Sequence, residues 1–205
     1  VIDTAGDPPL PYVCAAYLGL AQISYEWGAW DNVDKYGQLG IKFGLQLPSV
    51  DVPAACHVLF ARAKLAQNDL EAAKARLDEA EQSTQQKYRD KPLPEITAVR
   101  IQLLLQQGSY AAAIQLANDQ QLPLSLARAH LAAGNVEAAL AAIETARQNA
   151  SEKPVDQLKI IVLEALAQQQ PANRERGIDL ISKALTMAEA GGLMRTFMDE
   201  GKPMK

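Results

Sequence analysis

The sequence predicts an all-α fold, a right-handed superhelix of about five helical hairpins. A recurring motif carries this prediction: a tight polar turn, then a large apolar residue, then a small residue three positions further. The motif begins at Gly28, Asn68, Gly108 and Gly134, at intervals of 40, 40 and 26 residues. Intervals of this size are typical of stacked helix–turn–helix units. Aromatic residues make up only 5% of the chain, which suits close packing between helices rich in alanine and leucine.

Apolar residues also recur at fixed distances on both sides of each turn. The positions seven before the turns hold Ala21, Ala61, Ile101 and Ala127, and the positions nine after them hold Gly37, Leu77, Ala117 and Ile143. Residues spaced about one helical turn apart predict one apolar face per helix, and the small ones predict close crossings. This alternation is that of a tetratricopeptide repeat. Two departures stand out: glycines occupy core positions in the first repeat, and Arg100 occupies one in the third.

The chain is expected to form ten helices in five pairs. A fifth turn falls around residues 172–177, followed by the apolar residues Ile178, Ile181, Ala184 and Leu185. Prolines such as Pro53, Pro94, Pro123 and Pro154 lie at the joints, where a missing N–H is tolerated. The expected pairs are 11–27 with 30–46, 53–66 with 70–86, 94–106 with 110–118, 122–132 with 136–148, and 155–168 with 174–190. We expect residues 1–190 to be the repeat domain and 191–205 to be a C-terminal extension.

Composition and motifs argue against several classes of function. The net charge is −4, with 20 basic and 24 acidic side chains. Because the sequence contains no run of basic residues, we do not expect this region to bind nucleic acid. There is no phosphate-binding Gly-x4-Gly-Lys-Ser/Thr loop and no His-Glu-x-x-His pair. The two histidines, His57 and His130, fall on different repeats, so the sequence predicts no metal site, no cofactor and no enzyme.

The cysteines and the lack of a long apolar stretch bear on location. Cys14 and Cys56 are isolated on predicted helices, which favours small buried residues over a disulfide or metal pair. No stretch is long enough to span a membrane. These features predict a protein of a reducing compartment, the cytoplasm.

One polar pattern predicts a binding surface. The positions six before the four turns hold Gln22, Arg62, Gln102 and Arg128. If the first helices of the hairpins line a concave groove, these side chains form a polar ladder across it, with Tyr25 and Glu26 beside its first member. Such groups suit hydroxyls, carbonyls or carboxylates, and the Tyr25 ring is expected to add a stacking face. A plain solvated helix side is the alternative interpretation.

Three segments carry a more specific resemblance. They are residues 9–27, with Tyr25-Glu26-Trp27 at the end; residues 127–140; and residues 184–201, with the stretch Phe197-Met-Asp-Glu-Gly201. Together they resemble the helical-repeat region of MalT-like, LuxR-type ATP-dependent transcriptional activators. The resemblance covers nearly the whole chain in order, although the interval of 26 residues between the third and fourth turns is shorter than usual.

That resemblance implies a sensor module of a transcription regulator. In such proteins a nucleotide-binding module lies upstream, so ATP is expected only there, and a helix-turn-helix DNA-binding domain lies downstream. The repeat region would bind a small-molecule inducer or a protein or peptide partner, with possible self-association, and pass its state to those modules. The alternative is a general tetratricopeptide scaffold for protein–protein interaction with no role in transcription.

Overall fold

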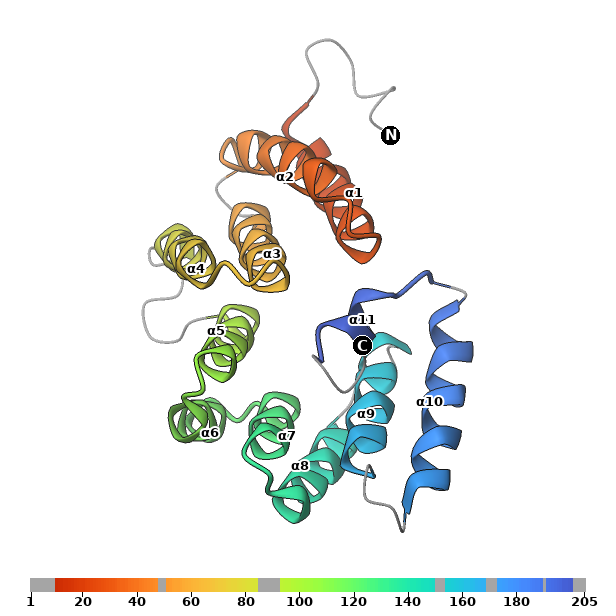
Figure 1. Ribbon diagram of the computed structural model, residues 1–205. Helices are drawn as coiled ribbons and strands as arrows, with labels where there is room; N and C mark the ends of the chain where they lie inside the picture. Colours follow the sequence, from red (N-terminus) through yellow and green to blue (C-terminus); the bar gives the residue numbers. More distant parts are fainter. Residues whose placement is uncertain are drawn as a thin grey trace. The chain divides into compact units, whose positions relative to one another are not determined.

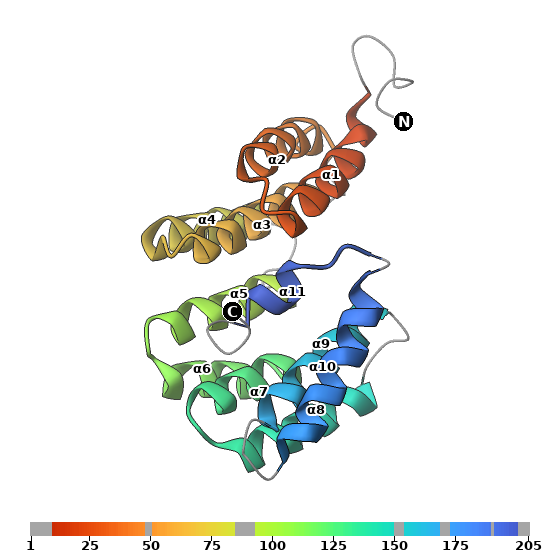
Figure 2. The same ribbon diagram turned by 45° about the vertical axis from the view of Figure 1, so that its right-hand side comes forward.

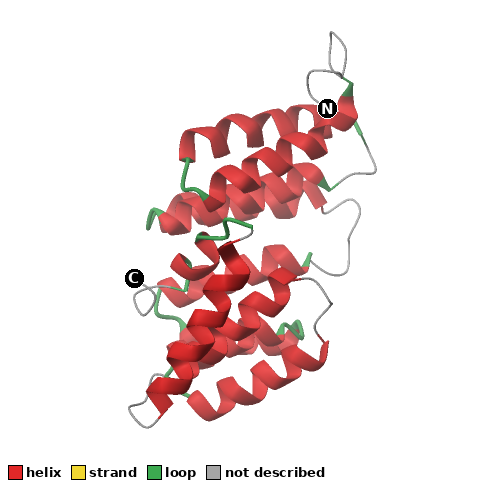
Figure 3. Cartoon of the chain, turned by 90° about the vertical axis from the view of Figure 1, so that its right-hand side faces the viewer, coloured by secondary structure: helices red, strands yellow, loops and turns green. Residues whose placement is uncertain are grey.

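The computed structural model describes residues 10–47, 51–84, 93–149, 154–168, 173–189 and 191–200. All its regular elements in these ranges are helices, as Figure 3 shows. The chain divides into two compact units, residues 1–103 and 104–205. The expected helix ends at 85–86 and 190, Ala172 of the fifth turn, and Gly201 lie outside the described residues.

The first unit contains two complete helical pairs and most of a fifth helix. After a short 3-10 turn at Pro11–Val13, the helices are α1 (Cys14–Glu26), α2 (Trp30–Gly44), α3 (Val52–Ala66), α4 (Leu70–Thr84) and α5 (Pro94–Gln106), as Figure 1 labels them. The unit boundary falls within α5. These bounds agree closely with the expected spans. Pro53 and Pro94 lie in the first turns of α3 and α5, where a proline ring fits the helix start.

The second unit continues the pairs and adds a helix that the sequence did not predict. Its helices are α6 (Tyr110–Asp119), α7 (Pro123–Ala132), α8 (Val136–Asn149), α9 (Pro154–Ala167), α10 (Arg174–Glu189) and α11 (Arg195–Met198). Figure 2 shows α7 to α10 following one another in antiparallel pairs. The four-residue α11 lies in the expected C-terminal extension, and it packs on the second unit through Phe197.

The recurring turn has a backbone cause. Its first residue has positive φ in all four copies: 67° at Gly28, 61° at Asn68, 75° at Gly108 and 79° at Gly134. The N–H of the next residue then donates to a carbonyl five residues earlier, as in Ala29 to Ser24 at 2.9 Å and Asn135 to His130 at 2.8 Å. This is the Schellman ending of a helix, which requires a left-handed residue and favours glycine or asparagine there.

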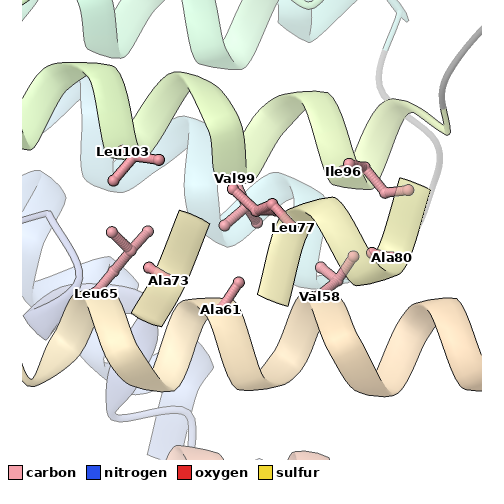
Figure 4. Close-up of a cluster of buried hydrophobic side chains, with 9 residues drawn as sticks. All are labelled: Val58, Ala61, Leu65, Ala73, Leu77, Ala80, Ile96, Val99 and Leu103. Atoms are coloured by element: carbon pink, nitrogen blue, oxygen red, sulfur yellow. The ribbon is translucent and has the colours of Figure 1, made fainter. Parts of the chain in front are cut away.

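The positions that flank the turns form the core. The residues seven before the turns, Ala21, Ala61, Ile101 and Ala127, are all 0% exposed. Figure 4 shows how one such layer is built, with side chains from α3, α4 and α5 meeting in a single cluster. Its members are Val58, Ala61, Leu65, Ala73, Leu77, Ala80, Ile96, Val99 and Leu103. The sequence pattern therefore identified the buried face of each pair.

The two departures from the repeat pattern have local explanations. An added Cβ at Gly37 would lie 2.4 Å from the Phe60 ring, and one at Gly40 would lie 2.8 Å from Cys56 Sγ. Helices α2 and α3 thus approach too closely for alanine. Arg100 remains half-buried on α5 and pairs with acidic side chains of α4, at 2.8 Å from Glu81 and 3.2 Å from Asp78.

Some predicted core residues are on the surface. Ile178 and Leu185 of α10 are 57% and 53% exposed, whereas Ala184 between them is fully buried. The expected apolar run therefore divides between two faces of α10, and only the face toward α9 is covered. Trp30, which follows the first turn, is half-buried and meets the Tyr25 ring edge-on at 5.9 Å.

Candidate functional site

The predicted ladder residues all lie on the first helices of their hairpins. Gln22 is exposed on α1, while Arg62 on α3, Gln102 on α5 and Arg128 on α7 are partly buried. Gln22, Arg62 and Gln102 belong to the first unit and Arg128 belongs to the second.

In the first unit, Arg62 and Tyr25 form one feature. The Arg62 guanidinium carbon lies 4.6 Å from the centre of the Tyr25 ring, a cation–π contact between α3 and α1. Tyr25 is only 1% exposed, so its ring packs in the core beneath the guanidinium. This corrects the expectation of an exposed stacking face: the ring supports and orients Arg62, and any ligand would meet the arginine first.

Two apolar side chains near the end of α1 are exposed, and neither of them was predicted from the sequence as a binding residue. Ile23, in the last turn of α1, is 49% exposed, and Trp27, which caps the C-terminal end of this helix, is 68% exposed. Glu26 lies between them in sequence and is half-buried. Exposed aromatic residues are frequent where proteins bind partners, and Trp27 already belonged to the Tyr-Glu-Trp segment that carried the resemblance.

In the second unit, Arg128 is held by a carboxylate of the same chain. Its Nε donates to Glu200 Oε1 at 2.8 Å and Oε2 at 2.9 Å, and its Nη2 donates to Oε1 at 2.6 Å. The two side chains are only 15% and 7% exposed. Burial lowers the pKa of Arg128, but the Glu200 and Asp199 carboxylates raise it, and the net change is upward. Arg128 is therefore a cation in contact with an anion.

The residues around Glu200 fix its position. Arg195 pairs with Asp199 across one turn of the α11 region, and Phe197 packs against α9 and α10. Asp199 and Glu200 belong to the Phe197-Met-Asp-Glu-Gly201 stretch that carries the family resemblance, but the sequence assigned neither of them a partner. No sequence spacing could have paired Glu200 with Arg128, because 72 residues separate them.

Other polar clusters connect neighbouring helices. Glu164 on α9 is mostly buried and accepts from Arg147 of α8 at 2.6 Å and from Arg176 of α10 at 3.0 Å. His57 Nδ1 lies 3.0 Å from Glu79. Within the described ranges, no group of three or more His, Cys, Asp or Glu residues could hold a metal ion.

The cysteines behave as small core residues. Cys14 and Cys56 are free and buried. Burial, with a smaller contribution from Cys14, raises the pKa of Cys56 to about 12. The burial of both residues agrees with the prediction of small core cysteines, and a thiol with a raised pKa, such as that of Cys56, is a poor nucleophile.

A shallow apolar groove of about 410 Å³ adjoins α11. It is lined by the end of α10 and by residues 192–197, with Leu193, Met194 and Phe197 among its walls. In the part of the chain that the structure describes, no helix is long and apolar enough to cross a membrane.

These features define the class of protein. Consecutive helical pairs, Schellman turns and polar side chains on the first helices make a helical-repeat scaffold of the tetratricopeptide type, and such regions are non-catalytic scaffolds. A family described as the MalT-like TPR region matches residues 1–205. The chain belongs to this family. A comparison with curated proteins gave no match.

Proposed function

We propose that this chain is the sensor region of a MalT-like transcription regulator of the LuxR type. It binds an effector or partner on the first helices of its hairpins and couples that state to ATPase and DNA-binding modules. The proposed binding residues are Gln22, Glu26, Arg62 and Gln102 in the first unit, with Tyr25 positioning Arg62 from beneath, and Arg128 in the second unit. Family membership supports the regulatory role, and the proposal places the protein in the cytoplasm.

The observation that carries the binding role is the supported guanidinium of Arg62. The Tyr25 ring restricts the arginine, so less side-chain freedom is lost when a ligand binds. Gln22 and Glu26 lie on α1, the helix that carries Tyr25, and they add amide and carboxylate groups. An uncharged sugar-like inducer and an acidic peptide tail remain the two candidate ligands for this unit.

Tryptophan fluorescence tests this proposal directly. Both tryptophans of the chain, Trp27 and Trp30, lie at the end of α1 and the start of α2, and Trp30 touches the Tyr25 ring. We expect a neutral oligosaccharide or an acidic peptide from a screened set to change this emission. Arg62→Ala should weaken the response at least tenfold, while Lys74→Ala, an exposed cation on α4, should leave it unchanged.

The alternative function is a general scaffold for protein–protein interaction. The exposure of Ile23 in α1 and of Trp27 at its C-cap favours it, because exposed apolar side chains of this size suit a protein partner. If a Trp27→Ser chain loses a protein partner while Arg62→Ala retains it, this alternative replaces the sensor proposal. Self-association through the same residues would appear as a concentration-dependent mass in solution.

A further inference from the structure

Residues 191–200 attach to the second unit through two chemically different contacts. Phe197 inserts its ring among Leu158, Ile161 and Val162 of α9 and two alanines of α10. Three residues later, Glu200 reaches Arg128 on α7. An aromatic residue and a carboxylate at this spacing therefore engage an apolar surface and a guanidinium together.

The ionic contact has the geometry of a recognition site. Three hydrogen bonds join one guanidinium edge to both carboxylate oxygens, the arrangement by which arginine selects planar anions. Both side chains are largely excluded from water, so screening by solvent is weak. A neutral ligand would leave the buried Arg128 charge without a counter-ion, which is costly.

We propose that Arg128 and the adjoining face of α9 form a carboxylate-recognition site that the chain's own segment 195–200 occupies. An acidic peptide segment, with an aromatic residue three positions before its carboxylate, competes for this site. The proposal rests on the effector-binding function stated above and deepens it, because it assigns an acidic peptide to the second unit. The segment 195–200 is then a built-in competitor that sets the threshold for binding.

The attachment of the segment suits displacement. Helix α11 has only four residues, and a Gly191-Gly192 turn with φ of 60° at Gly192 connects it to α10. A single helical turn makes fewer contacts in total than a full repeat, even though Arg195, Thr196 and Phe197 are buried, so it opens more readily than the helices on which it packs. A ligand tethered by a short linker has an effective concentration on the order of 1 mM. A free peptide with the same intrinsic affinity as the segment therefore displaces it only as its own concentration approaches that value, and a tighter-binding peptide does so at a proportionally lower concentration.

Trypsin cleavage after Arg195 measures release of the segment. Arg195 is buried and pairs with Asp199 in the attached state, so cleavage requires detachment. We expect Glu200→Gln to speed cleavage at Arg195 about tenfold or more, with helical content unchanged. Asp179→Asn, which removes an exposed carboxylate from the middle of α10, is the matched control and should cleave at the parent rate.

A labelled peptide tests recognition. The probe is an amidated peptide of residues 192–200 with fluorescein at its N-terminus, measured by anisotropy against full chains. The Glu200→Gln chain should bind it at least tenfold more tightly than the parent. The Arg128→Gln/Glu200→Gln chain should not bind it, and a probe with glutamine in place of its final glutamate should bind to none of them.

Several results would overturn the proposal. These are an unchanged cleavage rate in Glu200→Gln, equal peptide binding by all the chains, or loss of helical content in Glu200→Gln, which would make the contact a structural requirement. None of these readouts involves Arg62 or the tryptophans. A failed site in the second unit is therefore distinguishable from a failed sensor function in the first.

Discussion

Gly37 of α2 lies against the ring of Phe60 on α3, and the space between them does not admit a Cβ atom. Gly37→Ala should therefore lower the free energy of unfolding by about 1–3 kcal/mol, the usual effect of overpacking. Gly19→Ala in α1 is the matched control. No atom lies within 4 Å of its added Cβ, so alanine should raise stability by about 0.5–1 kcal/mol. Urea denaturation measures both, and equal effects of the two changes would contradict the assigned contact.

His57 predicts a pH dependence of stability. Burial lowers the pKa of His57, Glu79 opposes this effect and Arg76 adds to it, with a net lowering from 6.5. The unfolded chain then binds more protons than the folded chain, so this contribution to stability is present above pH 6.5 and is lost as the pH falls through the folded pKa. Thermal melts of the parent should show a fall in stability below pH 6.5, and His57→Gln should show a shallower one. If stability falls with pH as steeply in His57→Gln as in the parent, the pH dependence comes from groups other than His57.

At the scale of the element, the four turns share one backbone conformation. Gly134 has φ of 79°, and no atom lies within 4 Å of an added Cβ. Gly134→Ala therefore tests only the strain of placing a side chain on a residue with positive φ, and it should lower the free energy of unfolding by about 1 kcal/mol. Asn68 has the same conformation with a side chain already present, so Asn68→Gly should not destabilise the protein. Circular-dichroism melts can measure both, and a loss of stability in Asn68→Gly would contradict the shared geometry.

Helix positions were predictable because they depend on local chemistry. Schellman turns need a glycine or asparagine, helix starts tolerate proline, and apolar spacing follows the helical period. The exposed Ile178 and Leu185 show the limit of this reasoning. An apolar spacing predicts a face that could be buried, but burial requires a neighbouring helix, and sequence pattern does not say which face receives one.

At the scale of the whole molecule, helical repeats interact mainly with their neighbours. Leu77 is fully buried in the cluster that α3, α4 and α5 share. Leu77→Ala should lower the stability of the first unit by about 2–5 kcal/mol. Hydrogen exchange should then quicken in α3 and α4 and stay close to the parent rate in α8 and α9. A uniform increase across the chain would show that the repeats unfold as one cooperative block.

The candidate site was predictable only as a set of positions. Equivalent places in a repeat identified Arg62 and Arg128 as polar residues on the first helices. Their partners were not predictable, because a cation–π contact with Tyr25 and an ion pair with Glu200 depend on how separate helices come together. The same applies to Arg100, which the repeat pattern placed in the core and which is half-buried and paired with Asp78 and Glu81 of α4.

The sequence by itself determined the fold class and the helix boundaries, because these follow from short-range spacing that recurs in each repeat. The family was identified from the resemblance of three particular segments, residues 9–27, 127–140 and 184–201. Only the tertiary structure decided which of the predicted polar residues are exposed to solvent and which are paired with another side chain. It placed the Tyr25 ring beneath Arg62, added α11, and brought Glu200 to Arg128 across 72 residues of chain. Such contacts form when the packing of helices brings segments that are distant in sequence next to one another. A local sequence pattern does not specify which distant residues will meet.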